Sequence, residues 1–367
     1  MLPNPSPYFA ELTDPRRETK NKLHKLNDIL MIVLCSVLSG IEDWVGMEEF
    51  AREKESWFRQ FLELPNGVPS HDTLSDVMGR VHPQKFIEAF TAWVHVGLPS
   101  LSGEQVCVDG KSLRGSRDGD KKAVHVITAF AAKARMVLTQ QAVPEKTNEI
   151  TGIPDVLSMI DLTGALVSID AMGCQKEIAK QIVNAKADYL LALKENHVNL
   201  YDDVTLWLNS ESKKLKMIET VEKGHGRIEI RKYILSDQIA WLEQKPLWKG
   251  LTAVGRVEST RIIGETSTTE YRYYLCSFTG LERFAEAARG HWAIENTQHW
   301  VLDVQFAEDL NRSRKDRSPE NLALVRRMAL NIIRMNGPSK QSLRIRKLKA
   351  ALNDDYRYQL IFGGSAS

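Results

Sequence analysis

Hydrophobic positions in the first part of the chain repeat at helical spacing. The apolar run 29–38 predicts a buried core helix, and residues 43–64 form an amphipathic pattern that ends at a Pro-Asn-Gly turn. Ser70 is placed to cap a short helix that stops before Pro83, and a last helix begins just after this proline. We therefore predict an all-helical N-terminal domain over residues 1–98.

Two roles are open for these helices. Short helices joined by tight turns suit a helix-turn-helix DNA-binding unit, but they also suit an accessory bundle that packs against the rest of the protein. A recognition helix needs basic side chains, and residues 70–81 supply only Arg80 and His71. The sequence therefore favours the packing role.

A mixed pattern of strands and helices follows a short linker. Its order is three strands, then helix, strand, helix and strand, which is mixed α/β and not a strict alternation of strand and helix. We assign residues 103–200 to the first part of one α/β core. Its strands are predicted at 105–110, twice within 123–143, at 165–174 and at 188–194, and its helices at 149–161 and 175–187.

The hydrophobic pattern changes again after residue 200. Residues 201–280 alternate apolar and polar positions, as in GRIEIRKYIL, which is typical of strands with one exposed face. Helical spacing returns after Leu281 and continues to about residue 336. We predict that a β-rich insertion, 201–280, interrupts the α/β core, that the core resumes at 281–336, and that residues 337–367 form a basic tail.

The composition is that of an ordinary globular protein, with 43% hydrophobic and 26% charged residues and a net charge of +2. Residues 311–357 hold 13 Lys or Arg and 4 Asp or Glu, an excess of nine positive charges, which predicts either a surface for a polyanion or a solvated helix face. The four cysteines have neither zinc nor disulfide spacing, which favours a reducing compartment. The run 29–38 is too short to span a membrane. We expect a cytoplasmic protein without a membrane segment.

Two aspartates end apolar strands. VCVD ends in Asp109 and is followed by Gly110, and VSID ends in Asp170 and is followed by Ala171. Aspartate is uncommon inside strands, and ligands bind at the carboxyl ends of strands in α/β sheets. A small residue after each aspartate leaves room for a metal ion to approach. These positions favour a ligand site, with turn capping as the alternative.

A third carboxylate, Glu295, lies in the helical segment HWAIENTQHW. If this helix crosses the ends of the two strands, Glu295 meets Asp109 and Asp170 in one site. Three carboxylates suit Mg²⁺ or Mn²⁺, and two such ions can activate the attacking oxygen and stabilise the leaving oxygen of a phosphoryl displacement. This arrangement makes the three acids candidate catalytic residues that hold two metal ions, and turn capping by the two aspartates is the alternative.

Histidines and tryptophans surround Glu295. His291 and His299 lie on the same helix face as Glu295, but eight residues span about 12 Å of helix, which is too far for both rings to bind one zinc ion. We assign the two histidines a structural, hydrogen-bonding role. Trp292 and Trp300 have the same spacing and predict packing of this helix on the sheet.

Several separate motifs, in order, resemble one known family. VDGKSLRGS, SIDAMGCQ, LLALKENH, HGRIEIR and HWAIENTQHWVLDVQFAED are similar to motifs of the DDE transposases of bacterial insertion sequences, in the branch of H-repeat-associated proteins. The resemblance covers nearly the whole chain. It implies an RNase H-like mixed sheet with helices on both faces, Asp109 on the first strand, Asp170 on the fourth, Glu295 on a late helix, and a β-strand insertion before that helix.

The surroundings of Glu295 depart from the family pattern. Relatives carry a tyrosine seven residues before the glutamate, an arginine four before it and a lysine seven after it, where this chain has Ala288, His291 and Leu302. The three side chains that handle DNA are therefore not carried over. We expect other basic residues nearby to contact phosphate in their place: Arg289, Arg312 and Arg314.

Further basic residues are placed to contact DNA, with ordinary surface solvation as the alternative. Two follow the first aspartate, one ends a strand on the predicted active-site edge, and two share the charged face of a strand in the insertion. These residues are Lys111 and Arg114, Lys194, and Arg227 and Arg231.

The combined prediction is a DNA transposase that cuts at the ends of a mobile element and transfers the freed strand to target DNA. An RNase H-like nuclease that cuts without joining is an alternative, because hydrolysis and strand transfer differ only in the attacking hydroxyl. A catalytically inactive DNA-binding protein is another. The resemblance also implies a homodimer that pairs two element ends on double-stranded DNA, acting at the nucleoid.

Overall fold

The fold is built on one mixed β-sheet. The computed structural model describes residues 1–19, 22–143, 149–224 and 226–363. Along the described chain the strands are β1 (Gln105–Ser112), β2 (His125–Ala131), β3 (Met136–Val143), β4 (Leu166–Ile169), β5 (Asp188–Leu193), β6 (Met217–Gly224), β7 (Arg227–Ser236), β8 (Ala253–Ile263) and β9 (Thr266–Cys276).

The strand order is β3-β2-β1-β4-β5-β9-β8-β7-β6. β1, β2 and β3 are antiparallel neighbours, whereas β4 pairs parallel with both β1 and β5. This five-stranded half has the RNase H-like arrangement that the sequence predicted, and the prediction of a mixed α/β fold is confirmed. The carboxyl ends of β1 and β4 lie at the same edge because the two strands run parallel.

The N-terminal region is helical, as predicted. Ser70 caps its helix by accepting a hydrogen bond from the Thr73 backbone N–H, and the run at 29–38 forms part of a helix whose apolar side chains are almost completely buried. The helices of this region are α1 (Ser6–Ala10), α2 (Leu26–Leu38), α3 (Trp44–Glu53), α4 (Glu55–Phe58), α5 (His71–Arg80) and α6 (Pro83–Gly97).

The remaining helices lie among and after the strands. The α-helices are α7 (Glu149–Ser158), α8 (Lys176–Asn184), α9 (Val198–Glu211), α10 (Leu281–His291), α11 (Trp300–Phe306), α12 (Ser318–Asn336), α13 (Leu343–Leu352) and α14 (Asp354–Phe362). Shorter turns are η1 (Arg114–Ser116), η3 (Glu195–His197), η4 (Lys245–Leu247), the π-helical η5 (Ile294–His299) and η6 (Glu308–Leu310).

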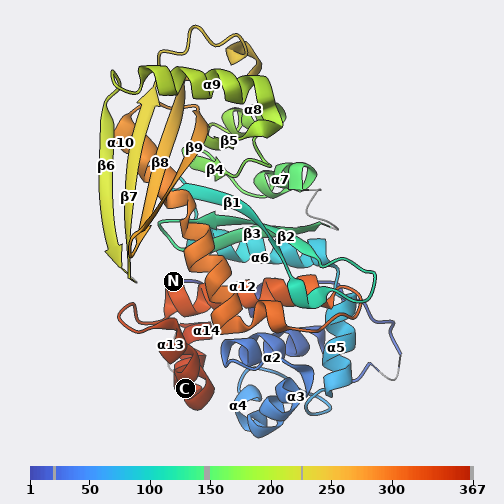
Figure 1. The fold of residues 1–367 in the computed structure, drawn as a ribbon. Helices are drawn as coiled ribbons and strands as arrows, with labels where there is room; N and C mark the ends of the chain where they lie inside the picture. The colour runs from blue at the N-terminus through green and yellow to red at the C-terminus, as the bar shows by residue number, and fades with distance from the viewer. Residues whose placement is uncertain (20–21, 144–148, 225, 364–367) are drawn as a thin grey trace.

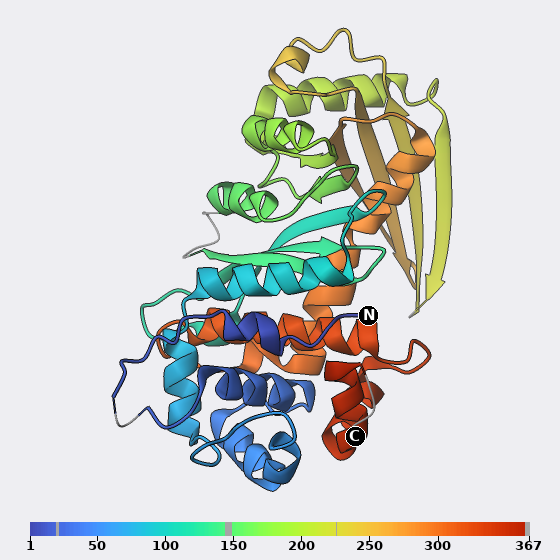
Figure 2. The same ribbon diagram turned by 180° about the vertical axis from the view of Figure 1, so that it is seen from behind.

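Helices cover both faces of the sheet. α10 packs on β1 and β4, where Gln105 donates a hydrogen bond to the Ala287 carbonyl. α7 packs on β2 and β3 from the opposite face. α12 closes the outer edge of β3, because the Asn331 amide bonds both the N–H and the carbonyl of Val137 in place of a further strand. Figures 1 and 2 show α12 between the sheet and α2, so the N-terminal helices and the sheet share α12 as a common packing element.

The region predicted as a β-rich insertion, residues 201–280, begins with a helix and not with a strand. Residues 201–211 belong to α9, and the strands begin only with β6. β9 pairs with β5, so β6 to β9 extend the same sheet, and Figure 1 shows these strands projecting along one side of the molecule.

The described part of the predicted basic tail, residues 337–363, is partly packed against the protein. Residues 343–362 form α13 and α14. Within 311–357, five of the basic side chains are buried, so the excess of positive charge does not form one exposed surface; they are Arg326, Arg327, Arg346, Lys347 and Arg357. In the described part of the chain, no helix is long and apolar enough to cross a bilayer.

Candidate active site

Asp109 and Asp170 lie at neighbouring strand ends. In the parallel pair of β1 and β4, Val108 is the register partner of Ile169, which makes Asp109 and Asp170 the next residues along the same edge. The Asp170 carboxylate accepts backbone N–H bonds from Met172, at 3.1 Å, and from Gly173, at 3.4 Å. The turn after β4 therefore fixes this carboxylate at the sheet edge.

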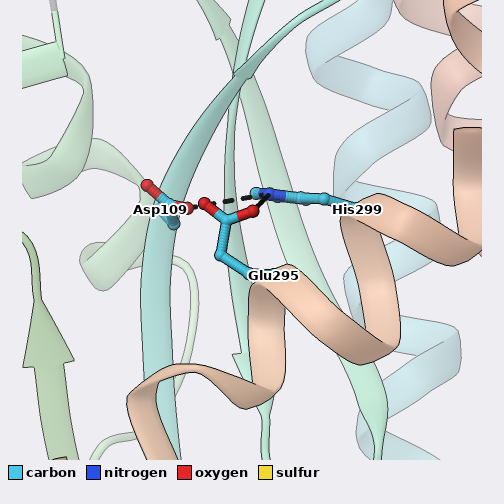
Figure 3. Close-up of side chains that lie close together, drawn as sticks. All are labelled: Asp109, Glu295 and His299. Carbon is cyan, nitrogen blue, oxygen red and sulfur yellow. Dashed lines mark ion pairs between the residues drawn. The ribbon is translucent and has the colours of Figure 1, made fainter. Parts of the chain in front are cut away.

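Glu295 reaches the same edge from the helical segment after α10. It lies in η5, where one π-helical turn interrupts the helix, a feature that is frequent at functional sites. Asp109, Glu295 and His299 each offer one ligand atom, and these atoms lie within 4.8 Å of one another. Figure 3 shows the three side chains pointing toward one another, from β1 and from two successive turns of the helix.

The electrostatics of the site indicate unbalanced negative charge. Burial, together with the charges of Glu295 and Asp170, raises the pKa of Asp109 to about 8. Burial and the charge of Glu149 also raise the pKa of Asp170. Contact with His299 lowers the pKa of Glu295. A divalent cation among these acids would relieve their repulsion, and their oxygen donors suit Mg²⁺ or Mn²⁺.

A small polar cluster anchors α10 to the sheet and so positions Glu295. The Gln105 amide donates to Ser168 Oγ at 2.9 Å and to the Ala287 carbonyl at 2.8 Å. His291 Nδ1 lies 3.0 Å from the same hydroxyl, and burial lowers the pKa of His291 to about 4. His291 is therefore neutral near pH 7 and orders the helix, which agrees with the structural role predicted for it.

Lys111 is buried inside the protein, in contrast to the predicted phosphate contact. Its Nζ lies 2.7 Å from Asp303, 2.8 Å from Asp309 and 3.6 Å from Glu308, and only 9% of the side chain is exposed. Burial alone would lower the pKa of Lys111, but the charge of Glu308 and the bonds to the two aspartates raise it. Lys111 thus ties β1 to the segment after Glu295 instead of facing solvent.

Gly110 provides space for a buried pair on the other face of β1. His125 Nε2 contacts Glu149, and His125 Nδ1 lies 3.0 Å from Ser112 Oγ. A Cβ at position 110 would collide with both His125 and Glu149. This pair was not predictable from the sequence, because its members come from separate elements.

We expect Gly110→Ala to destabilise the protein by about 1–3 kcal/mol, because the added methyl overpacks a site occupied by His125 and Glu149. Urea unfolding measures the effect. Gly224→Ala is the matched control, because a Cβ there meets no atom within 4 Å. Equal stability of the two variants would contradict this packing.

Three of the predicted DNA-binding residues line one cleft beside Glu295. Its volume is about 840 Å³. It runs from strands β6, β7, β8 and β9 to Asn296, the residue after Glu295. Arg231 and Arg289 both pair with Glu222, at 3.0 and 3.2 Å. Arg227 is the third predicted residue in this lining.

The other predicted DNA-binding residues lie outside this cleft. Lys194 is exposed after β5, and its charge acts on Asp170. Arg114 is 83% exposed and 3.4 Å from Asp309. Arg314 lies 3.4 Å from Asp118, and Arg312 is exposed.

The predicted packing of the two tryptophans on the sheet is wrong. Trp292 is 36% exposed and Trp300 is 57% exposed. Trp292 lines the cleft, and the Arg272 guanidinium lies 4.3 Å from its ring centroid. The positions that carry tyrosine and lysine in the family pattern, Ala288 and Leu302, are buried instead.

Comparison with known families gives two matches. The family model described as "Transposase DDE domain" matches residues 101–332, and the one described as "DDE_Tnp_1-associated" matches residues 7–94.

Curated relatives cover most of the chain. An "Uncharacterized protein in dhlA 3'region" of Xanthobacter autotrophicus is 47% identical over 76% of this chain and 96% of its own length. "Putative transposase YncI" of Escherichia coli O157:H7 is 36% identical over 95% of this chain and 92% of its own length. "H repeat-associated putative transposase YhhI" of Escherichia coli K12 is 35% identical over 96% of both chains.

Among solved structures, the piggyBac transposase synaptic complex with hairpin DNA aligns with a TM-score of 0.42 and 10% identity. The alignment covers 96% of this chain and 77% of the other.

Proposed function

The chain belongs to the DDE transposase family, and on that premise we propose that it cuts DNA at the ends of a mobile element and joins the freed 3′ ends to target DNA. The observation that carries the proposal is the meeting of Asp109 and Glu295, with Asp170 on the adjacent strand, at one edge of an RNase H-like sheet. Neither joining nor cutting needs a covalent enzyme intermediate in this scheme.

We assign Asp109, Asp170 and Glu295 to hold two Mg²⁺ or Mn²⁺ ions, with Asp109 between the other two acids. When bound, such ions activate the attacking oxygen and stabilise the leaving oxygen of the displacement. The raised pKa of Asp109, which burial and the neighbouring acids cause, supports this assignment because it reflects charge that a cation would balance. Lys194, whose charge acts on Asp170, is placed to hold a phosphate at the same edge.

We assign the cleft beside Glu295 to DNA. Its lining includes the basic side chains Lys223, Arg261 and Arg272 in addition to the three predicted arginines. Phosphate contacts by such side chains supply most of the affinity of proteins for DNA. The exposed ring of Trp292 offers a surface on which a base can stack.

Replacing Arg289 or Arg231 by alanine should weaken DNA binding and make it less dependent on salt. Each phosphate contact that is lost lowers the slope of log affinity against log salt by about 0.9. Fluorescence anisotropy with labelled duplex DNA between low and moderate salt measures the slope. Arg59→Ala is the control. Arg59 pairs with Glu55 in the N-terminal helical region, which is far from the cleft residues in sequence. Unchanged slopes for both cleft variants would contradict the assignment of this cleft to DNA.

An assay with pre-cleaved element ends tests the proposed function. The ends are taken from the inverted repeats expected on either side of the gene, and joined product with Mg²⁺ or Mn²⁺ is the predicted result. Cutting of intact ends without any joining would favour the nuclease alternative. DNA binding with neither cutting nor joining would favour the inactive DNA-binding protein. The paired-end homodimer and the division into domains at residues 98, 200, 280 and 336 remain part of the proposal.

A further inference from the structure

His299 lies one turn after Glu295 and points at the two acids. Only 6% of the residue is exposed. Its Nδ1 lies 3.6 Å from Asp109 Oδ2 and also 3.6 Å from Glu295 Oε2, and Figure 3 shows the ring directed at both carboxylates. The sequence predicted a structural, hydrogen-bonding role for His299, whereas its buried imidazole faces two carboxylates with one nitrogen.

These separations are too long for hydrogen bonds, which join heavy atoms at about 2.7–3.2 Å. They match the spacing of ligands around one ion, since donors held about 2.0–2.2 Å from a cation lie roughly 3–3.6 Å apart. Among the described residues, the other ring nitrogen of His299, Nε2, is buried without a hydrogen-bond partner. Within the described chain, therefore, no hydrogen bond of Nε2 turns the His299 ring away from the two carboxylates.

The π-helical turn explains why His299 can reach the acids. η5 spans Ile294–His299, so the widened π-helical turn separates Glu295 from His299 and places His299 one turn further along the helix. β1 presents Asp109 opposite that turn, and Lys111 of the same strand holds the following segment through Asp303 and Asp309. The strand, the π-helical turn and the ion pairs together fix all three donor groups.

We propose that His299 is the third protein ligand of the ion held by Asp109 and Glu295, and that its nitrogen makes this position select Mn²⁺ or a similar transition-metal ion over Mg²⁺. Mg²⁺ strongly prefers oxygen ligands, whereas first-row transition metals accept imidazole nitrogen. The inference rests on the proposed function for the identity of the site, but it concerns only this chain's own donors.

Electron spin-echo envelope modulation of the full-length protein loaded with Mn²⁺ tests the proposal. Wild-type protein should show modulation from a directly bound ¹⁴N nucleus. Incorporation of ¹⁵N-histidine should change this modulation to the ¹⁵N pattern, a test that needs no substitution. His299→Gln should remove the modulation and weaken Mn²⁺ binding about tenfold or more while changing Mg²⁺ binding less than about threefold. His95→Asn, at an exposed site on α6, should retain the modulation.

The outcomes separate this inference from the function on which it rests. Mn²⁺ binding that requires Asp109 but shows no nitrogen modulation would overturn the role of His299 and leave the carboxylate site intact. Modulation that persists unchanged in folded His299→Gln would also overturn it. If the wild-type protein shows no Mn²⁺ binding that depends on Asp109, both the metal site and the proposed function are contradicted.

Discussion

Asp170→Asn is expected to lower the rate of DNA cleavage about a thousandfold or more, with DNA binding retained. The asparagine oxygen can still accept the backbone N–H bonds of Met172 and Gly173, so the turn after β4 should persist. What is lost is the negative charge that would hold a metal ion against the reacting phosphate.

Single-turnover cleavage of an element end measures this effect, and filter binding of the same DNA checks that the variant still binds. Asp72→Asn is the matched control, because its carboxylate is 93% exposed on α5. Cleavage by Asp170→Asn at the wild-type rate would refute the metal-binding role of Asp170.

Glu308→Gln should lower the free energy of unfolding by about 3 kcal/mol or more. Glu308 Oε1 lies 2.7 Å from Arg327 Nη1, and both side chains are almost fully buried. The substitution leaves the buried charge of Arg327 without its charged partner. It also removes one negative charge near Lys111. Removing one partner of a buried ion pair costs about 3–5 kcal/mol.

Urea unfolding of the two proteins at pH 7 gives this difference. Glu177→Gln serves as the control, because Glu177 is 83% exposed in its pair with Lys180, and such surface pairs contribute about 1 kcal/mol or less. The variant should also cut DNA more slowly, since Lys111 ties β1 to the segment after Glu295. A stability loss no larger than that of the control would mean that the buried cluster does not hold this segment.

The strand ends were predictable from sequence because their chemistry is local. Asp109 and Asp170 each follow an apolar run, and parallel pairing of β1 with β4 then places both at one edge. The order of strands and helices between residues 105 and 194 was readable for the same reason, since apolar runs, turn residues and caps lie next to one another in the chain.

The features that were missed depend on contacts between distant segments. From the sequence, Lys111 was predicted to be a surface cation. In the structure it is surrounded by Asp303 and Asp309, which come from beyond the insertion in the chain. Trp292 and Trp300 have core spacing, but spacing alone does not tell which side of a helix faces the protein, and the π-helical turn changes that side. The position of His299 beside Asp109 and Glu295 depends on the same turn.

Metal binding by Asp109, Asp170 and Glu295 is the central property of the proposed active site. Diffraction from crystals grown with Mn²⁺, measured at the manganese absorption edge, locates such ions by anomalous scattering. We predict two peaks, one between Asp109 and Asp170 and one between Asp109 and Glu295, each about 2.0–2.3 Å from carboxylate oxygens. Manganese bound only elsewhere on the protein, with no peak near these oxygens, would contradict the assignment of this edge of the sheet as a catalytic metal centre.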